Sequence, residues 1–166
     1  MSKRDNLVFG KNSQDIIKEC LRNNGYVVYA IDDNTDWYVS GDFILASPDG
    51  VVAFGDAKGK TQSTYYRIGD VEEHGIDYNT WQRYLSICEF RNLAHAHIAV
   101  YERTREMDAF GKEEGRLRPS NVVLLYNLFS PYRENTTTAN YGKGGMVYWK
   151  RDEHIEKWKI VPAEVT

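Results

Sequence analysis

The sequence has little cysteine and no long apolar run. Its two cysteines, Cys20 and Cys88, lie in apolar helical patterns where buried free thiols are common, and a disulfide framework would need more of them. No segment approaches the ~20 apolar residues that span a bilayer, and the N-terminus has no apolar signal-peptide segment. We therefore expect a soluble, cytoplasmic protein that is neither exported nor inserted into a membrane.

The sequence also lacks an excess of positive charge. It has 21 Lys and Arg residues against 24 Asp and Glu residues, a formal net charge of −3. No global positive field is available to hold nucleic acid by counterion release, so a polyanion must be bound locally. With 42% hydrophobic and 27% charged residues, the composition excludes a fibrous, disordered or collagen-like chain. We expect a single domain, residues 1–166, that buries a core without disulfides.

Hydrophobic spacing predicts a helix and then a strand at the start of the chain. Apolar side chains share one helical face between residues 13 and 24, and Ser13 can cap the start of this helix. Gly25 occupies the place of a left-handed residue that ends it. Residues 26–31 are rich in β-branched and aromatic side chains, which favours a strand.

The second half of the chain predicts another helix and further strands. Residues 59–76 have no clear period, so we expect a long excursion there. A second helix follows Asp77, with an apolar stripe formed by Trp81, Tyr84, Leu85 and Cys88. Strands are expected at residues 97–103, 121–128, 146–150 and 157–161. This order of elements predicts an α/β fold with a mixed sheet.

A hairpin formed by residues 41–47 and 51–58 carries the most informative residues. The loop at residues 48–50, Pro-Asp-Gly, suits a type I turn followed by a left-handed glycine. This turn fixes the register of the two strands and places Asp42 directly opposite Asp56. Their Cβ atoms are then expected to lie about 4.5–5.5 Å apart on one face.

Two facing carboxylates suggest a metal site. They repel each other unless a cation lies between them, and carboxylate oxygens suit Mg²⁺ or Mn²⁺. Lys58 points to the same face as Asp56 and can orient or deprotonate a water, or stabilise a phosphorane, while a metal polarises the phosphate. The alternative is a solvent-exposed ion pair of Asp56 and Lys58. Apolar residues on both faces of these strands favour the site, because charges at the end of a covered strand often mark one.

Asp42 followed by Asp56-Ala57-Lys58 resembles the D…(D/E)xK signature of the PD-(D/E)XK nuclease superfamily. The preceding helix, with Gly10 and Lys11 before it and Gly25-Tyr26 after it, is similar to the opening helix of archaeal-type Holliday-junction resolvases and related phage and repair nucleases. The resemblance extends over residues 9–103, the expected catalytic core. The remaining residues, 104–166, are expected to add strands that complete the domain.

The resemblance implies a restriction-endonuclease-like three-layer sandwich, with a central mixed sheet flanked by helices. It also implies a Mg²⁺- or Mn²⁺-dependent DNA endonuclease that is structure-selective like a resolvase and works as a homodimer. Asp42 and Asp56 would be metal ligands, the Ala57 carbonyl a third ligand, and Lys58 the catalytic lysine. A catalytically degenerate nuclease fold that binds nucleic acid or protein is the rival interpretation, and RNA as the substrate stays open.

The sequence departs from the family pattern at three positions. Gly41 stands where the motif has proline, and Gln14 where the family has a glutamate on the first helix. Gln14 can offer a carbonyl oxygen to the metal but no charge, or it is simply a polar helix residue. Gln82 resembles a glutamine that faces the active site in several superfamily members, although the associated tyrosine stands at Tyr84 instead of position 86. The alternative for Gln82 is a solvated helix residue.

Residues after the catalytic strand are candidates for substrate contact. Cations and aromatic rings that can hold phosphates and stack on bases cluster there, at Lys60, Tyr65, Tyr66 and Arg67. A second group is better explained as ordinary surface, namely Lys143, Tyr148, Trp149, Lys150 and Arg151. His95 and His97 share a strand face, but no third ligand is near in sequence, so we do not expect a zinc site.

Overall fold

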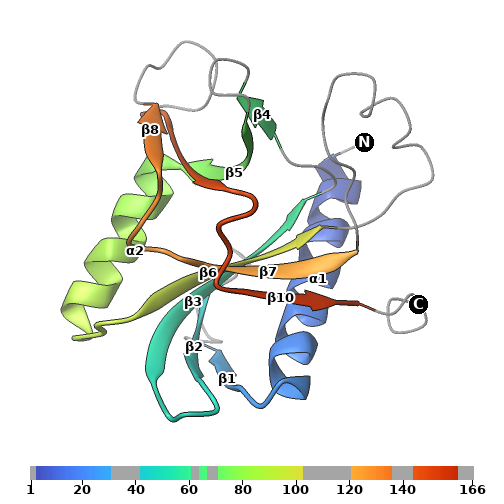
Figure 1. Cartoon of the computed structure of the whole chain (residues 1–166), viewed down its shortest axis with the longest axis vertical. Helices are drawn as coiled ribbons and strands as arrows, with labels where there is room; N and C mark the ends of the chain where they lie inside the picture. The colour runs from blue at the N-terminus through green and yellow to red at the C-terminus, as the bar shows by residue number, and fades with distance from the viewer. Residues whose placement is uncertain are drawn as a thin grey trace.

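In the described part of the chain, each of the helices α1 and α2 is followed by a run of strands (Figure 1). The computed structural model describes residues 3–30, 42–60, 64–66, 71–102, 121–135 and 144–160. In chain order, the elements are α1 (Lys3–Asn23), β1 (Val27–Ala30), β2 (Asp42–Ala46), β3 (Val52–Lys60), β4 (Thr64–Tyr66), β5 (Val71–Asp77), α2 (Tyr78–Phe90), β6 (Ala96–Glu102), β7 (Val122–Asn127), β8 (Arg133–Asn135), β9 (Met146–Lys150) and β10 (Glu156–Lys159).

Within these residues the strands form two sheets. The larger sheet has the order β1-β2-β3-β6-β7-β10, in which β3 and β6 run parallel and every other neighbouring pair is antiparallel. The smaller sheet has the order β4-β5-β9-β8 and is antiparallel throughout. The predicted α/β fold with a mixed sheet is therefore confirmed, whereas the separate smaller sheet was not predicted.

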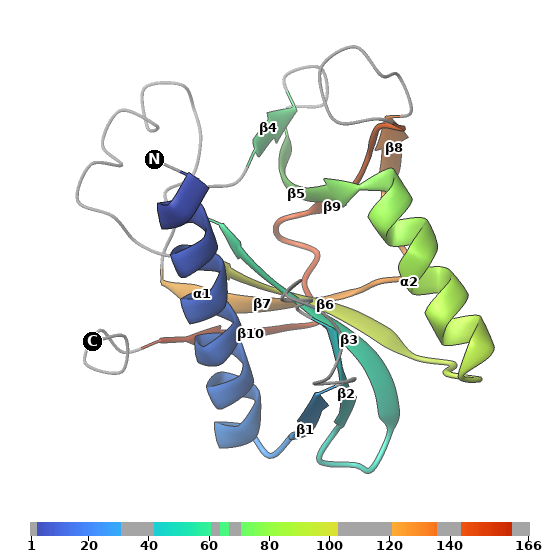
Figure 2. The ribbon, with the colours of Figure 1, turned by 180° about the vertical axis from the view of Figure 1, so that it is seen from behind.

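Both faces of the larger sheet are covered, and Figure 2 shows α1 and α2 on opposite sides of it. One face packs against α1 through a buried cluster that includes Ile17, Leu21 and Ala57. The other face packs against α2 and the smaller sheet through a cluster that includes Phe54 and Trp149. Residues of β3 contribute to both clusters, which confirms the prediction of a central strand covered on both sides. In the described part of the chain, no helix is both long and apolar enough to cross a membrane.

Helix α1 ends where the sequence predicts and begins earlier. Gly25 has a φ of +88°, and its N–H donates to the Arg22 carbonyl at 3.1 Å. The Tyr26 N–H donates to the Leu21 carbonyl at 2.9 Å, which completes a Schellman motif. The predicted start was wrong, since the helix begins at Lys3.

Ser13 lies inside α1 and therefore does not cap it. Ser13 is 1% exposed, because it lies one turn before the buried Ile17 on the helix face that packs against the sheet. Gly10 and Lys11 are also helical residues and do not precede the helix as expected. A glycine inside a helix costs only about 1 kcal/mol, so it does not by itself end one.

The segment at residues 59–76 is more regular than predicted. Strand β3 continues to Lys60, and β4 and β5 follow within the expected excursion. Strand β5 was missed because its buried polar residues, Glu73 and His74, are compensated by partners far along the chain. Strand β8 was missed because it consists of three polar residues. The other helix and strands agree with the predictions to within two residues at each end.

The β2–β3 hairpin has the predicted register. Asp42 pairs with Asp56, and Ala46 pairs with Val52. Gly50 has a φ of +83°, and its N–H donates to the Ser47 carbonyl at 2.8 Å. The turn and the left-handed glycine are therefore those that the loop sequence predicts.

Gly55 allows the hairpin to pack closely against its own side chains. A Cβ atom at this position would contact the ring of Phe43 and would lie 2.7 Å from Leu45 Cδ2, both buried side chains. We expect Gly55→Ala to lower the free energy of unfolding by about 1–3 kcal/mol, because overpacking forces neighbouring side chains to shift. Urea denaturation followed by tryptophan fluorescence measures the change.

Gly50→Asn is the matched control for Gly55→Ala. A Cβ at Gly50 would meet nothing within 4 Å, and asparagine tolerates the left-handed conformation found there. We expect this variant to change the free energy of unfolding by less than about 0.5 kcal/mol. Equal stability losses in the two variants would contradict the packing explanation.

Candidate active site

Strand β3 places Asp56 and Lys58 beside each other. The Lys58 Nζ lies 3.6 Å from Asp56 Oδ2. The side chain of Asp56 is 0% exposed and that of Lys58 is 33% exposed. The carboxylate is therefore not part of a solvent-exposed ion pair, and the pair opens to solvent only on the lysine side. Such a buried carboxylate with an accessible cation differs from the surface pairs that contribute little to folding.

The two residues belong to one face of the larger sheet. Side chains alternate along a strand, so Asp56 and Lys58 share the face of Phe54, which packs with α2 and the smaller sheet. The Ala57 side chain points to the opposite face and packs in the α1 cluster. The metal-binding role predicted for Ala57 concerns its carbonyl, which this packing leaves untested.

Position 42 completes the candidate site on the neighbouring strand. The Asp42 backbone pairs with Asp56 in the antiparallel β2–β3 register. The side chain of Asp42 lies outside the described part of the structure. On the other side of β3, Asp56 pairs with Ile98 and Lys58 pairs with Val100 in the parallel β3–β6 register. The strand partners of Asp56 and Lys58 on β6 are therefore apolar, whereas the partner of Asp56 on β2 is an aspartate.

Gln14 lies on α1, away from the face that carries Asp56 and Lys58. It follows the buried Ser13 and is itself partly exposed. Because α1 packs in the cluster that contains Ala57, it covers the opposite face of the sheet. The structure therefore brings Asp56 and Lys58 together and does not place Gln14 on their face. In the described residues, no group of three or more His, Cys, Asp or Glu side chains is arranged to hold a metal.

Gln82 lies on the exposed side of α2. Its side-chain amide donates a hydrogen bond to the Tyr78 hydroxyl at 2.9 Å, one helical turn away. The residues that α2 buries are Trp81, Tyr84 and Cys88, which are three of the four predicted stripe residues. This arrangement favours the solvated-glutamine interpretation of Gln82.

The predicted substrate-contact residues are described only in part. Lys60 ends β3, and Tyr65 and Tyr66 belong to β4, but their side chains lie outside the described structure, as does the whole of Arg67.

The second basic and aromatic group does not form a surface cluster. Tyr148 and Trp149 are buried, and Arg151 binds Glu102. Lys150 is partly exposed and lies 3.6 Å from Glu153. Lys143 is outside the described residues. Tyr148 and Trp149 therefore contribute to packing and do not form an open binding surface.

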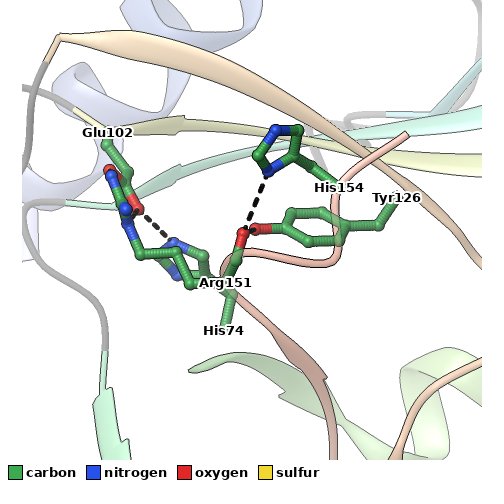
Figure 3. A network of polar contacts seen from close by, with 5 residues as sticks. All are labelled: His74, Glu102, Tyr126, Arg151 and His154. Carbon is green, nitrogen blue, oxygen red and sulfur yellow. Dashed lines mark hydrogen bonds and ion pairs between the residues drawn. The ribbon is translucent and has the colours of Figure 1, made fainter. Parts of the chain in front are cut away.

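A buried polar network near the candidate site was not predicted (Figure 3). Glu102, at the end of β6, is 0% exposed. Its Oε2 lies 2.5 Å from His74 Nε2, and Arg151 donates to both carboxylate oxygens at 2.7 and 2.6 Å. The Arg151 carbonyl accepts a hydrogen bond from the Tyr126 hydroxyl at 2.7 Å and lies 3.3 Å from His154 Nδ1.

The network keeps Glu102 ionised. Burial alone raises the pKa of Glu102, but hydrogen bonds from His74 and Arg151 and the charges of these residues outweigh burial and lower the pKa below its usual value. The hydrogen bonds and charge of Glu102 in turn raise the pKa of Arg151. The Arg151 guanidinium and the His74 ring therefore together compensate one buried carboxylate. The sequence carries no signal for this network, because His74 and Arg151 lie 28 and 49 residues from Glu102.

A second buried carboxylate, Glu73, precedes His74 on β5. It accepts hydrogen bonds from Arg133 Nη2 at 2.6 Å and Nε at 3.1 Å, and from the Tyr132 hydroxyl. Burial and the hydrogen bond to Glu73 raise the pKa of Tyr132 to about 12. The Arg133 guanidinium also lies 4.0 Å from the centre of the Tyr148 ring. This cluster ties strands within the smaller sheet, whereas Glu102 joins the two sheets.

Comparisons with protein-family models, with curated proteins and with solved structures found no match to this chain. The interpretation of the site therefore depends on its residues and their arrangement.

The Glu102 network predicts a pH-dependent contribution to stability. We expect Glu102→Gln to lower the free energy of unfolding at pH 7 by about 3 kcal/mol, because it leaves the partly buried Arg151 guanidinium without its counterion and the buried His74 ring without its carboxylate partner. The folded-state pKa of Glu102 is below its unfolded-state value, so this stabilisation is complete above the unfolded-state pKa and is lost as the pH falls through the folded-state pKa. The difference between wild type and variant should therefore shrink below about pH 4. Urea denaturation from pH 7 to pH 3 measures it.

Glu153→Gln is the control, because Glu153 pairs with Lys150 at the surface and is 61% exposed. It should change stability by less than about 0.5 kcal/mol at pH 7. A difference between wild type and Glu102→Gln that stays constant down to pH 3 would show that the carboxylate charge is not the source of the effect.

Proposed function

We propose that this protein is a Mg²⁺- or Mn²⁺-dependent endonuclease that hydrolyses phosphodiester bonds in DNA. The observation that carries the proposal is the pairing of Asp42 with Asp56, together with the burial of Asp56 beside Lys58. Charged residues in the middle of an otherwise apolar sheet are costly unless they serve a function or are compensated. Two carboxylates on paired positions supply the hard oxygen ligands that Mg²⁺ prefers.

The order of elements supports a restriction-endonuclease-like fold. Helix α1 is followed by the antiparallel strands β1, β2 and β3, and α2 then leads to β6, which runs parallel to β3. This is the core order that the resemblance implies. With α1 on one face of the sheet and α2 on the other, we assign the chain to the three-layer sandwich of that fold.

The residues of the site have distinct proposed roles. Asp42, Asp56 and the carbonyl of Ala57 would hold the metal, which when bound polarises the phosphate and lowers the pKa of its water. Lys58 is 33% exposed, so its ammonium can reach a phosphate that approaches from solvent. There it donates a hydrogen bond to a phosphate oxygen and stabilises the charge that develops on it. The buried Asp56, whose Oδ2 lies 3.6 Å from Lys58 Nζ, limits the orientations of the lysine.

The wider biological setting follows from the same resemblance. We infer a structure-selective, resolvase-like enzyme that acts as a homodimer, because paired cuts need two sites. Its two cysteines, Cys20 and Cys88, are free and buried, which suits a reducing cytoplasm.

A catalytically degenerate fold that binds nucleic acid or protein is the second candidate. The observation that favours it is the position of Gln14, which replaces an expected acidic ligand and lies on the helix that covers the other face of the sheet. A site with fewer charged ligands binds a metal less tightly. Metal binding and cleavage therefore separate the two candidates.

Cleavage of labelled DNA tests the enzyme. Linear duplex, single strands, four-way junctions and RNA are incubated with Mg²⁺, Mn²⁺ or EDTA. We expect metal-dependent cleavage by the wild type and a loss of about 10³-fold or more in kcat for Asp56→Asn and Lys58→Ala. Asp49→Asn is the matched control, because Asp49 is an exposed aspartate in the turn of the same hairpin and should retain full activity.

Calorimetry with Mn²⁺ accompanies the cleavage experiment. A site that Asp42→Asn and Asp56→Asn abolish but Asp49→Asn preserves supports the enzyme. If the protein binds nucleic acid but neither cleaves it nor binds a metal, the nuclease proposal is wrong and the non-catalytic binding module is supported.

Gln82→Ala tests the exposed position on α2. Because the Gln82 amide bonds to Tyr78 on the solvent side, we expect kcat and KM to change by less than about twofold. A large fall in kcat with normal stability would restore Gln82 as a catalytic residue. Thermal unfolding of the same preparation supplies the stability control.

A further inference from the structure

Tyr29 lies on the same face of the larger sheet as Asp56. It pairs with Ile44 in the β1–β2 register, and Ile44 pairs with Phe54 in the β2–β3 register. Paired residues of neighbouring strands point to one face, and Asp56 shares this face because it lies two residues after Phe54. Val28, the residue before Tyr29, packs in the α1 cluster on the opposite face. Tyr29, Ile44 and Phe54 therefore form one row across three strands that lie side by side in Figure 2.

The next row on this face is that of the candidate site. Asp42 and Asp56 pair with each other, and each lies two residues along its strand from the row of Tyr29. Strands rise about 3.3 Å per residue and lie about 4.8 Å apart, so the Cα atoms of Tyr29 and Asp42 are about 8 Å apart. The Tyr29 ring is therefore within reach of a nucleotide whose phosphate is held by the two aspartates.

The Tyr29 ring is available to a ligand. Tyr29 is 60% exposed, whereas Phe54 in the same row is 0% exposed and lies under the Tyr84 ring of α2, with ring centres 5.1 Å apart. Among the described residues, neither β1 nor β2 contributes a side chain to the α2 cluster. Val27 and Val52 extend this open apolar face and are 47% and 49% exposed. Such a face beside a candidate site marks an interaction surface.

We propose that Tyr29 is a base-stacking residue of the site and that the substrate has an unpaired nucleotide beside the scissile phosphate. This inference rests on the proposed function, because the phosphodiester site places the substrate. The charges on this face follow a nucleotide from phosphate to base. Lys58, an accessible cation, suits the phosphate, and the uncharged ring of Tyr29, one row beyond the aspartates, suits the base.

Stacking on Tyr29 requires a base with a free face. In a duplex the neighbouring pairs cover both faces of each base, so a surface side chain stacks only on a base that is unpaired or flipped out. Stacking tolerates any sequence, because every base has a π face. The proposed enzyme therefore selects unpaired structure and not a base sequence. This narrows structure-selective cleavage to DNA with unpaired nucleotides next to the cut.

Strand β1 holds Tyr29 in a fixed position. All four residues of β1 pair with β2. The side chain of Val28 is buried in the α1 cluster, and its carbonyl accepts a hydrogen bond from Arg22 Nη2 at 3.3 Å. A ring carried by an anchored strand loses little conformational freedom when it binds a base, which favours affinity.

Binding of the full chain to two matched DNA probes tests the inference. One probe is a labelled duplex, and the other is the same duplex with a short unpaired stretch that contains 2-aminopurine. Fluorescence anisotropy with Ca²⁺ in place of Mg²⁺ measures affinity. We expect Tyr29→Thr to weaken binding of the unpaired probe by about tenfold and to leave duplex affinity within about twofold, because stacking stabilises the first complex alone. Threonine suits a strand but has no ring.

Tyr29→Phe and Phe90→Ala are the matched controls. Tyr29→Phe keeps the ring and should retain the affinity for the unpaired probe within about twofold. Phe90 is 89% exposed at the end of α2, outside the row of Tyr29, so Phe90→Ala should change neither affinity. Stacking quenches 2-aminopurine, so its fluorescence should fall with the wild type and both controls but not with Tyr29→Thr. Thermal unfolding checks that each variant is folded.

The outcomes separate this inference from the proposed function. Equal losses for both probes in Tyr29→Thr, no loss for either, or the same loss in Phe90→Ala would overturn the stacking role. If Tyr29→Thr changes only the oligomeric state, measured by analytical ultracentrifugation, the face contacts a second copy of the chain and the stacking role is wrong.

Cleavage by the wild type decides the nuclease independently. Metal-dependent cleavage without any effect of Tyr29→Thr would keep the nuclease and reject the stacking role. Stacking without cleavage under Mg²⁺ or Mn²⁺ would reject the nuclease and keep the stacking surface. Wild-type protein that binds neither probe overturns both.

Discussion

The central position of β3 is the constraint on which the candidate site and the Glu102 network both depend. On one side β3 pairs with β2, which sets Asp42 opposite Asp56. On the other side it pairs in parallel with β6, which sets Lys60 beside Glu102. Apolar clusters cover both faces of the strand, so a shift of register by one residue would move Asp56 and Lys58 to the face where Ala53 and Ala57 now pack. The strand is therefore held in place by pairing and by packing together.

Buried carboxylates in this protein are compensated in two ways. Glu102 and Glu73 each accept bidentate hydrogen bonds from an arginine, and a second donor completes each cluster. Such clusters contribute geometry more than net stability, because the cost of desolvating the charges offsets much of their attraction. At Asp56, the carboxylate lies 3.6 Å from Lys58, two residues further along the same strand, and a second aspartate, Asp42, pairs opposite it. This contrast is the reason that the proposed chemistry involves Asp56, while the two glutamates have structural partners.

Local rules explain which parts of the fold could be predicted. The three-residue loop before Val51 determines the hairpin register, and Gly25 ends α1, because both depend on backbone conformations that neighbouring residues decide. The apolar stripe of α2 likewise follows from its own spacing. The predicted start of α1 was wrong because serine is a common cap residue, which made Ser13 a plausible first residue. Only the burial of Ser13 against the sheet shows that the helix continues through it.

By itself, the sequence determined the paired positions of Asp42 and Asp56, the mixed α/β order and the ends of several elements, since these depend on residues close together along the chain. Only the tertiary structure decided the existence of the smaller sheet, the exposed position of Gln82, and the network around Glu102. The reason is that a charged residue in a sequence is expected to face solvent. It becomes part of a buried strand only when folding supplies a compensating partner, and for Glu102 those partners are 28 and 49 residues away.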